Sequence, residues 1–168
     1  MIISRLGLNI GIGIAVMAGL GGFARAQAPV QATTRPEINA PLPTVPDEII
    51  AFRQANFKWM GETFADMKKA IESGADVTPF APKAADIAVW AHRIPTVFPV
   101  GTETGHNTKA EPAVWSNHAV FEERAAAMGL QAVKLASVAA SGDKAAFADQ
   151  YKVTGAACGA CHREFRAR

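Results

Sequence analysis

Two absences narrow the fold and the function of this 168-residue chain. No segment alternates apolar and polar residues over a useful length, so the sequence predicts no β-sheet. Positive charge is not in excess either once residues 1–26 are set aside. Those residues hold Arg5 and Arg25 and no acidic residue, so their removal lowers 17 basic groups to 15, against 15 acidic groups. A neutral chain gives no support for binding to nucleic acid or for stable association with a membrane surface.

The N-terminal residues also lack the length of uninterrupted apolar sequence that a membrane anchor needs. Leu6 to Gly22 is apolar but short and rich in glycine, and it follows a single positive charge at Arg5. Small residues then occupy the positions expected before a cleavage site. This pattern predicts a signal peptide over residues 1–26 and export to the periplasm. Cleavage after Ala28 is the less favoured alternative, because Pro29 would then follow the cut directly.

The segment that follows, residues 27–46, holds five prolines. Proline-rich sequence of this kind predicts an extended arm without a core of its own. The remaining residues, 47–168, predict one domain that is long enough to bury a hydrophobic core.

Cysteine is scarce, and both cysteines lie in Cys158-Gly-Ala-Cys161-His162. Cys-x-x-Cys-His is the attachment signature of c-type haem, in which two thiols add to the vinyl groups and the adjacent imidazole reaches the iron. On a helix these three residues share one side. A structural zinc site would need a fourth ligand, and a thioredoxin-like pair would need a preceding strand. A disulfide between the two cysteines would close a loop too short to constrain the fold.

Four amphipathic helices are predicted, because apolar residues recur at steps of three and four. The first is expected to begin at a capping box, Thr44-x-x-Asp47, with Pro46 in its first turn, and to end at Gly74. The second is expected over 83–94 and the third over 112–140, with a loop over 98–105 between them. Asp143 is expected to cap the fourth. The sequence thus predicts an all-α, antiparallel four-helix bundle.

The fourth helix is the one that would carry the cofactor. Its apolar positions and its cysteines follow one spacing of three and four: Phe147, Tyr151, Thr154, Cys158, Cys161 and Phe165. Both thiols therefore lie on the side of the helix that faces the core. This arrangement predicts covalently attached haem c inside the bundle.

From Pro46 to Arg168 the chain resembles class II cytochromes c, and most closely the cytochrome c′ family. The shared features, in order, are Arg53-Gln54, Phe98-Pro-x-Gly-Thr-Glu103, Pro112-x-x-Trp115 and Cys158-Gly-Ala-Cys-His-x-x-Phe-Arg166. The resemblance implies an exported haem protein that exchanges electrons with redox partner proteins and binds NO or CO, with NO scavenging as a candidate role. It also implies a homodimer, joined through the outer face of the first helix and part of the second.

The resemblance further implies a role for each residue of the motifs. One haem c would be held by thioethers to Cys158 and Cys161, with His162 as the iron ligand. Arg53 and Gln54 would lie at the haem edge, where a guanidinium can pair with a propionate. Two loop residues would approach the same region and one residue would lie on the proximal side: Thr102, Glu103 and Arg166.

The sixth iron position decides the chemistry. In the family it is covered by the residue four positions after the arginine, which here is Phe57. Phenylalanine cannot ligate iron, so we expect five-coordinate, high-spin haem in an apolar pocket that admits NO and CO. The alternative is a six-coordinate, low-spin electron carrier of the c556 type, with Met60 as the ligand. No acid–base pair accompanies Phe57, so an enzyme that cleaves O–O bonds is not expected.

The other histidines and aromatic residues are expected to have structural roles. His118 is expected to be a hydrogen-bonded residue of the core rather than an iron ligand. His92 and His106 are expected to be exposed. Core packing around the haem is expected of Phe64, Trp115 and Phe121.

Overall fold

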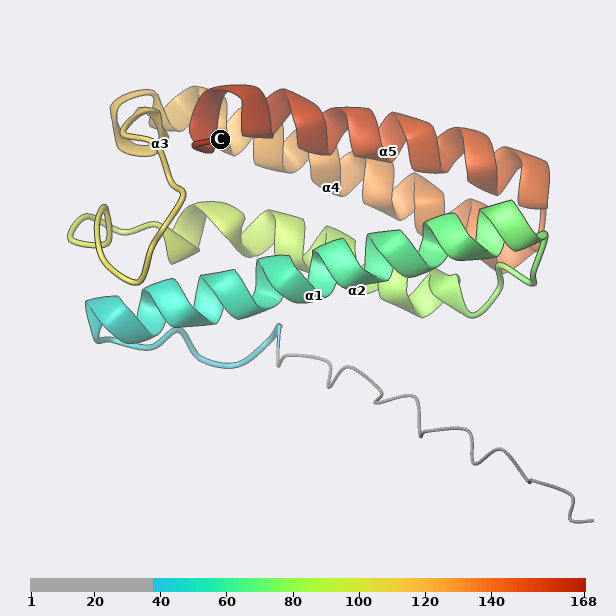
Figure 1. The fold of residues 1–168 in the computed structure, drawn as a ribbon, viewed down its shortest axis with the longest axis horizontal. Helices are drawn as coiled ribbons and strands as arrows, with labels where there is room; N and C mark the ends of the chain where they lie inside the picture. Colours follow the sequence, from blue (N-terminus) through green and yellow to red (C-terminus); the bar gives the residue numbers. More distant parts are fainter. Residues whose placement is uncertain (1–37) are drawn as a thin grey trace, which may run out of the picture. The chain divides into compact units, whose positions relative to one another are not determined.

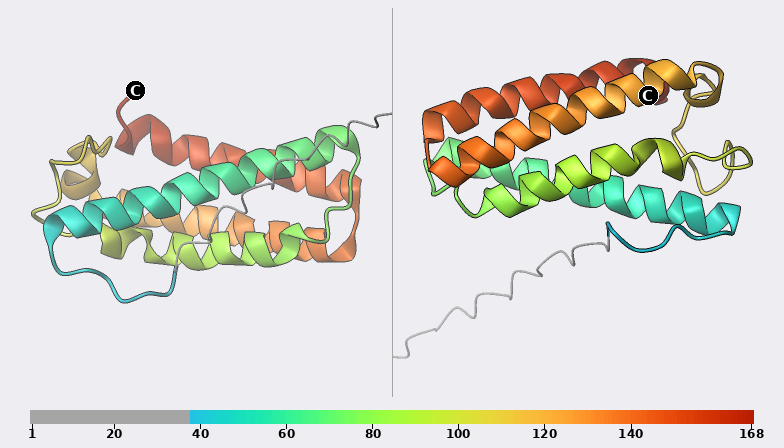
Figure 2. Two further views of the ribbon diagram at one scale, coloured as in Figure 1. Left: turned by 60° about the horizontal axis from the view of Figure 1, so that its bottom comes forward. Right: turned by 180° about the vertical axis from the view of Figure 1, so that it is seen from behind.

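Four long helices run side by side in the computed structural model, which describes residues 38–168 (Figures 1 and 2). In chain order the elements are α1 (Pro46–Ser73), α2 (Phe80–Arg93), the 3₁₀ turn η1 (Ile94–Val97), α3 (Ala113–Ser116), α4 (His118–Ser141) and α5 (Lys144–Phe165). This part of the chain contains no strand, and one isolated β-bridge joins Ala110 to Arg166. The predicted all-α bundle is therefore confirmed.

None of the helices within residues 38–168 combines the length and the apolar character needed to cross a membrane. The predicted signal peptide, and the part of the proline-rich arm before residue 38, lie outside the described residues.

Both ends of α1 are set by local chemistry. Pro46 occupies the first turn, where its missing N–H costs no helical hydrogen bond. Gly74 ends the helix in the left-handed conformation, with φ of 64°, and its N–H donates to the carbonyl of Ile71 at 3.2 Å. The predicted capping box is wrong: the N-cap is Val45, and no side chain caps the helix.

The second helix begins at Phe80, three residues before its predicted start. Pro82 was expected to precede the helix, but proline is tolerated within a first turn.

The third predicted helix is in fact two, which corrects the sequence interpretation. Asn117, with φ of −125° and ψ of 46°, separates the four-residue α3 from α4. From α3, the indole of Trp115 donates to the carbonyl of Phe98 at 2.9 Å. This hydrogen bond links the short helix to the loop after η1.

The remaining junctions follow the prediction. Gly142 ends α4 with φ of 74°, and the Asp143 carboxylate accepts a hydrogen bond from the N–H of Ala146 to cap α5. A Cβ placed on Gly129 of α4 would lie 3.3 Å from the Cβ of Ala91 on α2, so glycine permits the close approach of these two helices.

The described end of the arm packs on the bundle. Ile38 is 1% exposed and belongs to the hydrophobic core. Its carbonyl accepts a hydrogen bond from Arg93 of α2, whose guanidinium lies 5.6 Å from the ring centroid of Phe52 on α1. The arm thus has no core of its own, but it adds an apolar residue to the core formed by the helices.

Candidate cofactor site

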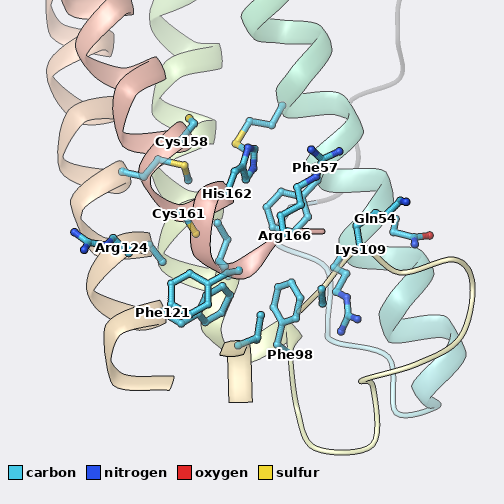
Figure 3. A pocket seen from close by; sticks show the side chains of 18 of the residues that line it. Gln54, Phe57, Phe98, Lys109, Phe121, Arg124, Cys158, Cys161, His162 and Arg166 are labelled. Atoms are coloured by element: carbon cyan, nitrogen blue, oxygen red, sulfur yellow. The ribbon is translucent and has the colours of Figure 1, made fainter. Parts of the chain in front are cut away.

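A cavity of about 560 Å³ opens between α1, α4, α5 and the segment after η1 (Figure 3). Its volume lies within the roughly 300–1,000 Å³ that ligand and cofactor sites occupy. The cavity brings together residues that are up to about a hundred positions apart in the sequence. Seven of the nine site residues predicted from the sequence line it: Arg53, Gln54, Phe57, Cys158, Cys161, His162 and Arg166.

The two thiols and the imidazole enter the cavity from one side of α5, as the helical spacing requires (Figure 3). Phe147, Thr154 and Phe165 of the same helix are buried. Both thiols are free. Burial raises the pKa of the Cys158 thiol. The pKa of Cys161 is raised to about 11, mainly by burial and to a smaller extent by the neighbouring Cys158.

The imidazole of His162 is also tuned by its surroundings. Burial lowers its pKa, and the positive charge of Arg166 lowers it further. Both effects favour the neutral ring, which is the form that can ligate iron.

Opposite α5, the first helix contributes an apolar wall. The ring of Phe57 meets the edge of Trp90 at a centroid distance of 5.7 Å and lies 6.2 Å from the ring of Phe98. Met60, 7% exposed, lines the same cavity one turn further along α1. The wall that faces His162 therefore offers a phenyl ring and a thioether.

Three packed aromatic rings line one end of the cavity, and Figure 3 shows Phe98 and Phe121 there. Phe98 packs edge-on against Phe121 at 5.1 Å, and Phe121 packs in the same way against Phe165 at 5.1 Å. Phe121 was expected to pack in the core, and it is 3% exposed. Phe98 was expected in a loop, and its burial follows from contacts that the sequence does not show.

Arg53 is buried and its guanidinium is fully engaged at its two terminal nitrogens. Nη1 donates to the carbonyl of Val97 at 3.2 Å and to Oγ1 of Thr102 at 2.7 Å. Nη2 donates to the carbonyl of Thr102 at 2.7 Å and to Oγ1 of Thr108 at 3.1 Å. Burial lowers the pKa of Arg53 to about 10, although the charge of Glu103 opposes this shift.

Two residues predicted at the site do not line the cavity. Thr102 is buried behind Arg53, and the Glu103 carboxylate accepts a hydrogen bond from the N–H of Gly101. Both act on the site through the loop and through Arg53.

His118 was expected in the core, and this part of the prediction is wrong. His118 is the first residue of α4, and its side chain is 42% exposed. Its Nδ1 lies 3.0 Å from the carbonyl oxygen of Val114, and its Nε2 lies 3.5 Å from the Glu122 carboxylate. It is not among the cavity-lining residues. His92 and His106 are exposed, as predicted.

The charged residues that line the cavity are all cationic. Lysine and arginine side chains reach it from α1, α4, α5 and the loop, and within residues 38–168 no carboxylate lines it. Nε of Arg124 is buried without a hydrogen-bond partner. Sequence reasoning missed Lys109 and Arg124, because neither belongs to a motif and only the fold brings them here. Apolar walls, two thiols, an imidazole and several cationic side chains fit a flat, apolar group that carries anionic substituents, which is the chemistry of haem.

The fold and this donor set define an all-α protein of the c-type haem class. Residues 48–166 match the sequence profile of the family described as "Cytochrome C'". The chain belongs to the cytochrome c′ family. Members of this family bind haem c, so haem c attached through Cys158 and Cys161 is the cofactor of this protein.

Known relatives include both subtypes considered from the sequence. Cytochrome c′ of Rubrivivax gelatinosus is 33% identical over 126 residues, which cover 72% of this chain and 95% of the relative. Cytochrome c-556 of Agrobacterium tumefaciens (strain B2A) is 43% identical over 77 residues, which cover 45% of this chain and 60% of the relative.

Solved structures share the fold. A cytochrome c′ described as having ligand-controlled dimer dissociation superposes with a TM-score of 0.70 at 28% identity, covering 75% of this chain and 99% of that one. The nitric oxide complex of a mutant cytochrome c′ from Alcaligenes xylosoxidans gives a TM-score of 0.66 at 26% identity, covering 74% and 98%.

Proposed function

We propose that this protein carries five-coordinate, high-spin haem, binds NO and CO at the open iron position and exchanges single electrons with partner proteins. The observation that carries the proposal is the placement of Phe57. It lies on the α1 wall of the cavity, across from His162, and has no atom that can ligate iron (Figure 3).

The surroundings of Phe57 favour NO and CO over O₂. Bound O₂ gains from a hydrogen-bond donor on its side of the haem, whereas NO and CO bind well without one. Two of the α1 side chains that line the cavity with Phe57 are polar donors already bonded to the loop: a terminal nitrogen of Arg53 donates to the carbonyl of Thr102, and Nε2 of Gln54 donates to the carbonyl of His106. The solved relative that was crystallised with nitric oxide supports the same class of ligand.

The biological setting proposed is the periplasm, after removal of residues 1–26. NO scavenging fits that setting and is the role we propose for gas binding. We propose redox or gas-binding function without enzymatic turnover, because none of the described residues that line the cavity is a carboxylate that could act as a general acid or base. A homodimer is proposed by analogy with the relative whose dimer dissociates under ligand control.

A second candidate is a six-coordinate, low-spin electron carrier. Met60 favours it, because its thioether lines the same cavity as His162 and is one turn from Phe57. The similarity to a cytochrome c-556 supports the same alternative.

Absorption and EPR spectra of the haem-loaded mature chain distinguish the two candidates. We expect a high-spin ferric signal and a CO adduct of the ferrous form, and Phe57→Met is expected to convert the iron to low spin. Met60→Leu should then leave the spectrum unchanged, like the control Met67→Leu, whose side chain is buried outside the cavity. A low-spin protein that becomes high-spin in Met60→Leu would establish Met60 as the ligand and exclude open-site gas binding.

A further inference from the structure

The helix α4 carries apolar residues on two opposite sides. The inner stripe is buried and consists of Phe121, Ala125, Met128, Ala132, Leu135 and Ala139. An outer stripe repeats the same steps of three and four residues, and each of its members is exposed: Ala119, Glu123, Ala126, Leu130, Val133, Ser137 and Ala140. A helix that is apolar on all sides is normally buried on all sides. Within residues 38–168, however, the bundle buries only the inner stripe of α4.

The outer stripe contains two large apolar side chains. Leu130 is 65% exposed and Val133 is 58% exposed. None of the outer residues lines the cofactor cavity, to which α4 contributes Phe121, Arg124 and their neighbours on the inner side. A haem in the cavity therefore leaves the outer stripe exposed, and the stripe needs a different partner.

The outer face of α1, where the resemblance would place a dimer interface, has the opposite character. It carries three ion pairs within the helix: Lys58–Glu62, Lys68–Glu72 and Lys69–Asp66. Such pairs are typical of a helix face in water. On the neighbouring helix α2, Arg93 is engaged by the arm, because it donates a hydrogen bond to the carbonyl of Ile38. The apolar stripe of α4 is therefore better suited to contact a second copy.

Two charged residues of α4 lack a partner. Glu122 lies 3.5 Å from the imidazole of His118, and Arg124 lines the cavity. Glu123 and Lys134 have no hydrogen bond or ion pair with any residue of the described chain. They are eleven residues apart, which is roughly 16 Å along the helix, and Leu130 lies between them.

This order of charges makes the stripe complementary to itself. If two copies of α4 lie antiparallel about a two-fold axis near Met128, Glu123 of each copy lies beside Lys134 of the other. Leu130 of each copy then packs against Ala126 of the other, whose small side chain leaves room for it. Steps of three and four residues are the spacing of a seam between paired helices. One symmetric contact thus covers the apolar residues and pairs both charges.

We propose that the outer stripe of α4 is the surface through which two copies of this chain form a homodimer, with Glu123 of each copy paired to Lys134 of the other. The proposal rests on the homodimer proposed above and locates its interface. It is independent of the spin state of the haem and of the gas ligand. It moves the interface from the first helix to α4.

The experiment is sedimentation velocity of the haem-loaded mature chain over a range of concentrations. Leu130→Glu is expected to raise the dissociation constant of the dimer by about a hundredfold or more, because a charge replaces an apolar side chain at the centre of the interface. The matched control is Ala65→Glu, which adds the same charge at an exposed position of α1 and is expected to leave the dimer intact. Circular dichroism of each variant verifies that the fold is retained.

Charge reversal tests the antiparallel pairing. Glu123→Lys and Lys134→Glu are each expected to raise the dissociation constant by roughly tenfold, because each change turns two symmetry-related ion pairs into repulsions. The double variant, Glu123→Lys with Lys134→Glu, restores opposite charges across the interface. It is expected to regain the dissociation constant of the unmodified protein.

A dimer that persists in Leu130→Glu would overturn the proposal, and so would a dimer that dissociates in Ala65→Glu alone, which would assign the interface to α1. Failure of the double variant to regain affinity would overturn the pairing of Glu123 with Lys134. A monomeric unmodified protein would refute both the homodimer and this interface. Absorption spectra and CO binding of the same samples test the proposed gas-binding function separately, so its failure would be recognised independently of the result for α4.

Discussion

The guanidinium carbon of Arg53 lies 4.2 Å from the ring centroid of Phe98, so a buried cation on α1 covers an aromatic ring of the loop. The same ring packs against Phe57 and Phe121, which form the α1 and α4 sides of the cavity. Cation–π contact and four hydrogen bonds therefore act on one loop. We infer that Arg53 shapes the cavity by fixing Phe98.

Replacing Arg53 with methionine should destabilise the fold strongly. The change leaves two backbone carbonyls and two hydroxyls of the loop without their charged donor, and hydrogen bonds to charged groups contribute about 1.5–3 kcal/mol each. We expect the free energy of unfolding to fall by about 3 kcal/mol, measured by urea denaturation followed by circular dichroism. Arg163→Met, at an exposed position of α5, should change it by less than about 0.5 kcal/mol. Equal stabilities for the two variants would contradict the role given to Arg53.

The thiols of the haem-free chain should be poorly reactive once it has folded. The pKa of Cys161 rises from 9.0 to about 11 in the fold, so the thiolate fraction near neutral pH falls by about a hundredfold. We expect alkylation of Cys161 by iodoacetamide to be slower by that factor in the folded chain than in concentrated urea, measured by peptide mass spectrometry. Similar rates in the two conditions would show that the thiol is not desolvated.

The raised pKa of Cys161 also makes the stability of the haem-free fold depend on pH. A thiol whose pKa is raised by folding stabilises the haem-free fold fully below its ordinary pKa of 9.0, and this contribution is lost as the pH rises towards about 11.

The arm should contribute to stability through Ile38. Truncation of a fully buried isoleucine to alanine costs about 2–5 kcal/mol, and Ile38 is 1% exposed. We expect Ile38→Ala to lower the free energy of unfolding by about 2 kcal/mol, because a terminal segment can relax around the cavity it leaves. Val45→Ala, at a side chain that is 48% exposed in the same segment, is the control and should have little effect. If both variants match the unmodified protein, the arm does not dock in solution.

Local signals predicted most helix ends correctly, since a proline, a left-handed glycine and an aspartate cap act within a few residues of each end. Asn117 shows where such signals fail. Nothing in its own sequence neighbourhood breaks the apolar repeat, and the break is associated with the contact of Trp115 with the Phe98 carbonyl, 17 residues away.

The residues of the site also fall into two groups, those that local sequence predicts and those that only the fold brings together. Cys158, Cys161 and His162 were found because one helix carries them at fixed spacing. The hydrogen bonds of Arg53 span 44 to 55 residues, so their partners cannot be deduced from the residues around it. Lys109 and Arg124 were missed for the same reason: charge near a cavity becomes visible only when the elements that form the cavity are placed together.

The position of α5 at the C-terminal end of the bundle sets a time limit on maturation. Under the export that we propose, α1, α2 and α4 would emerge before the segment with the two thiols. Helical bundles rich in local contacts fold within microseconds to milliseconds. Because folding raises the pKa of both thiols, covalent attachment must compete with closure of the bundle. Under the proposed export, the yield of mature protein would depend on how soon haem is attached to α5 relative to the folding of the helices before it.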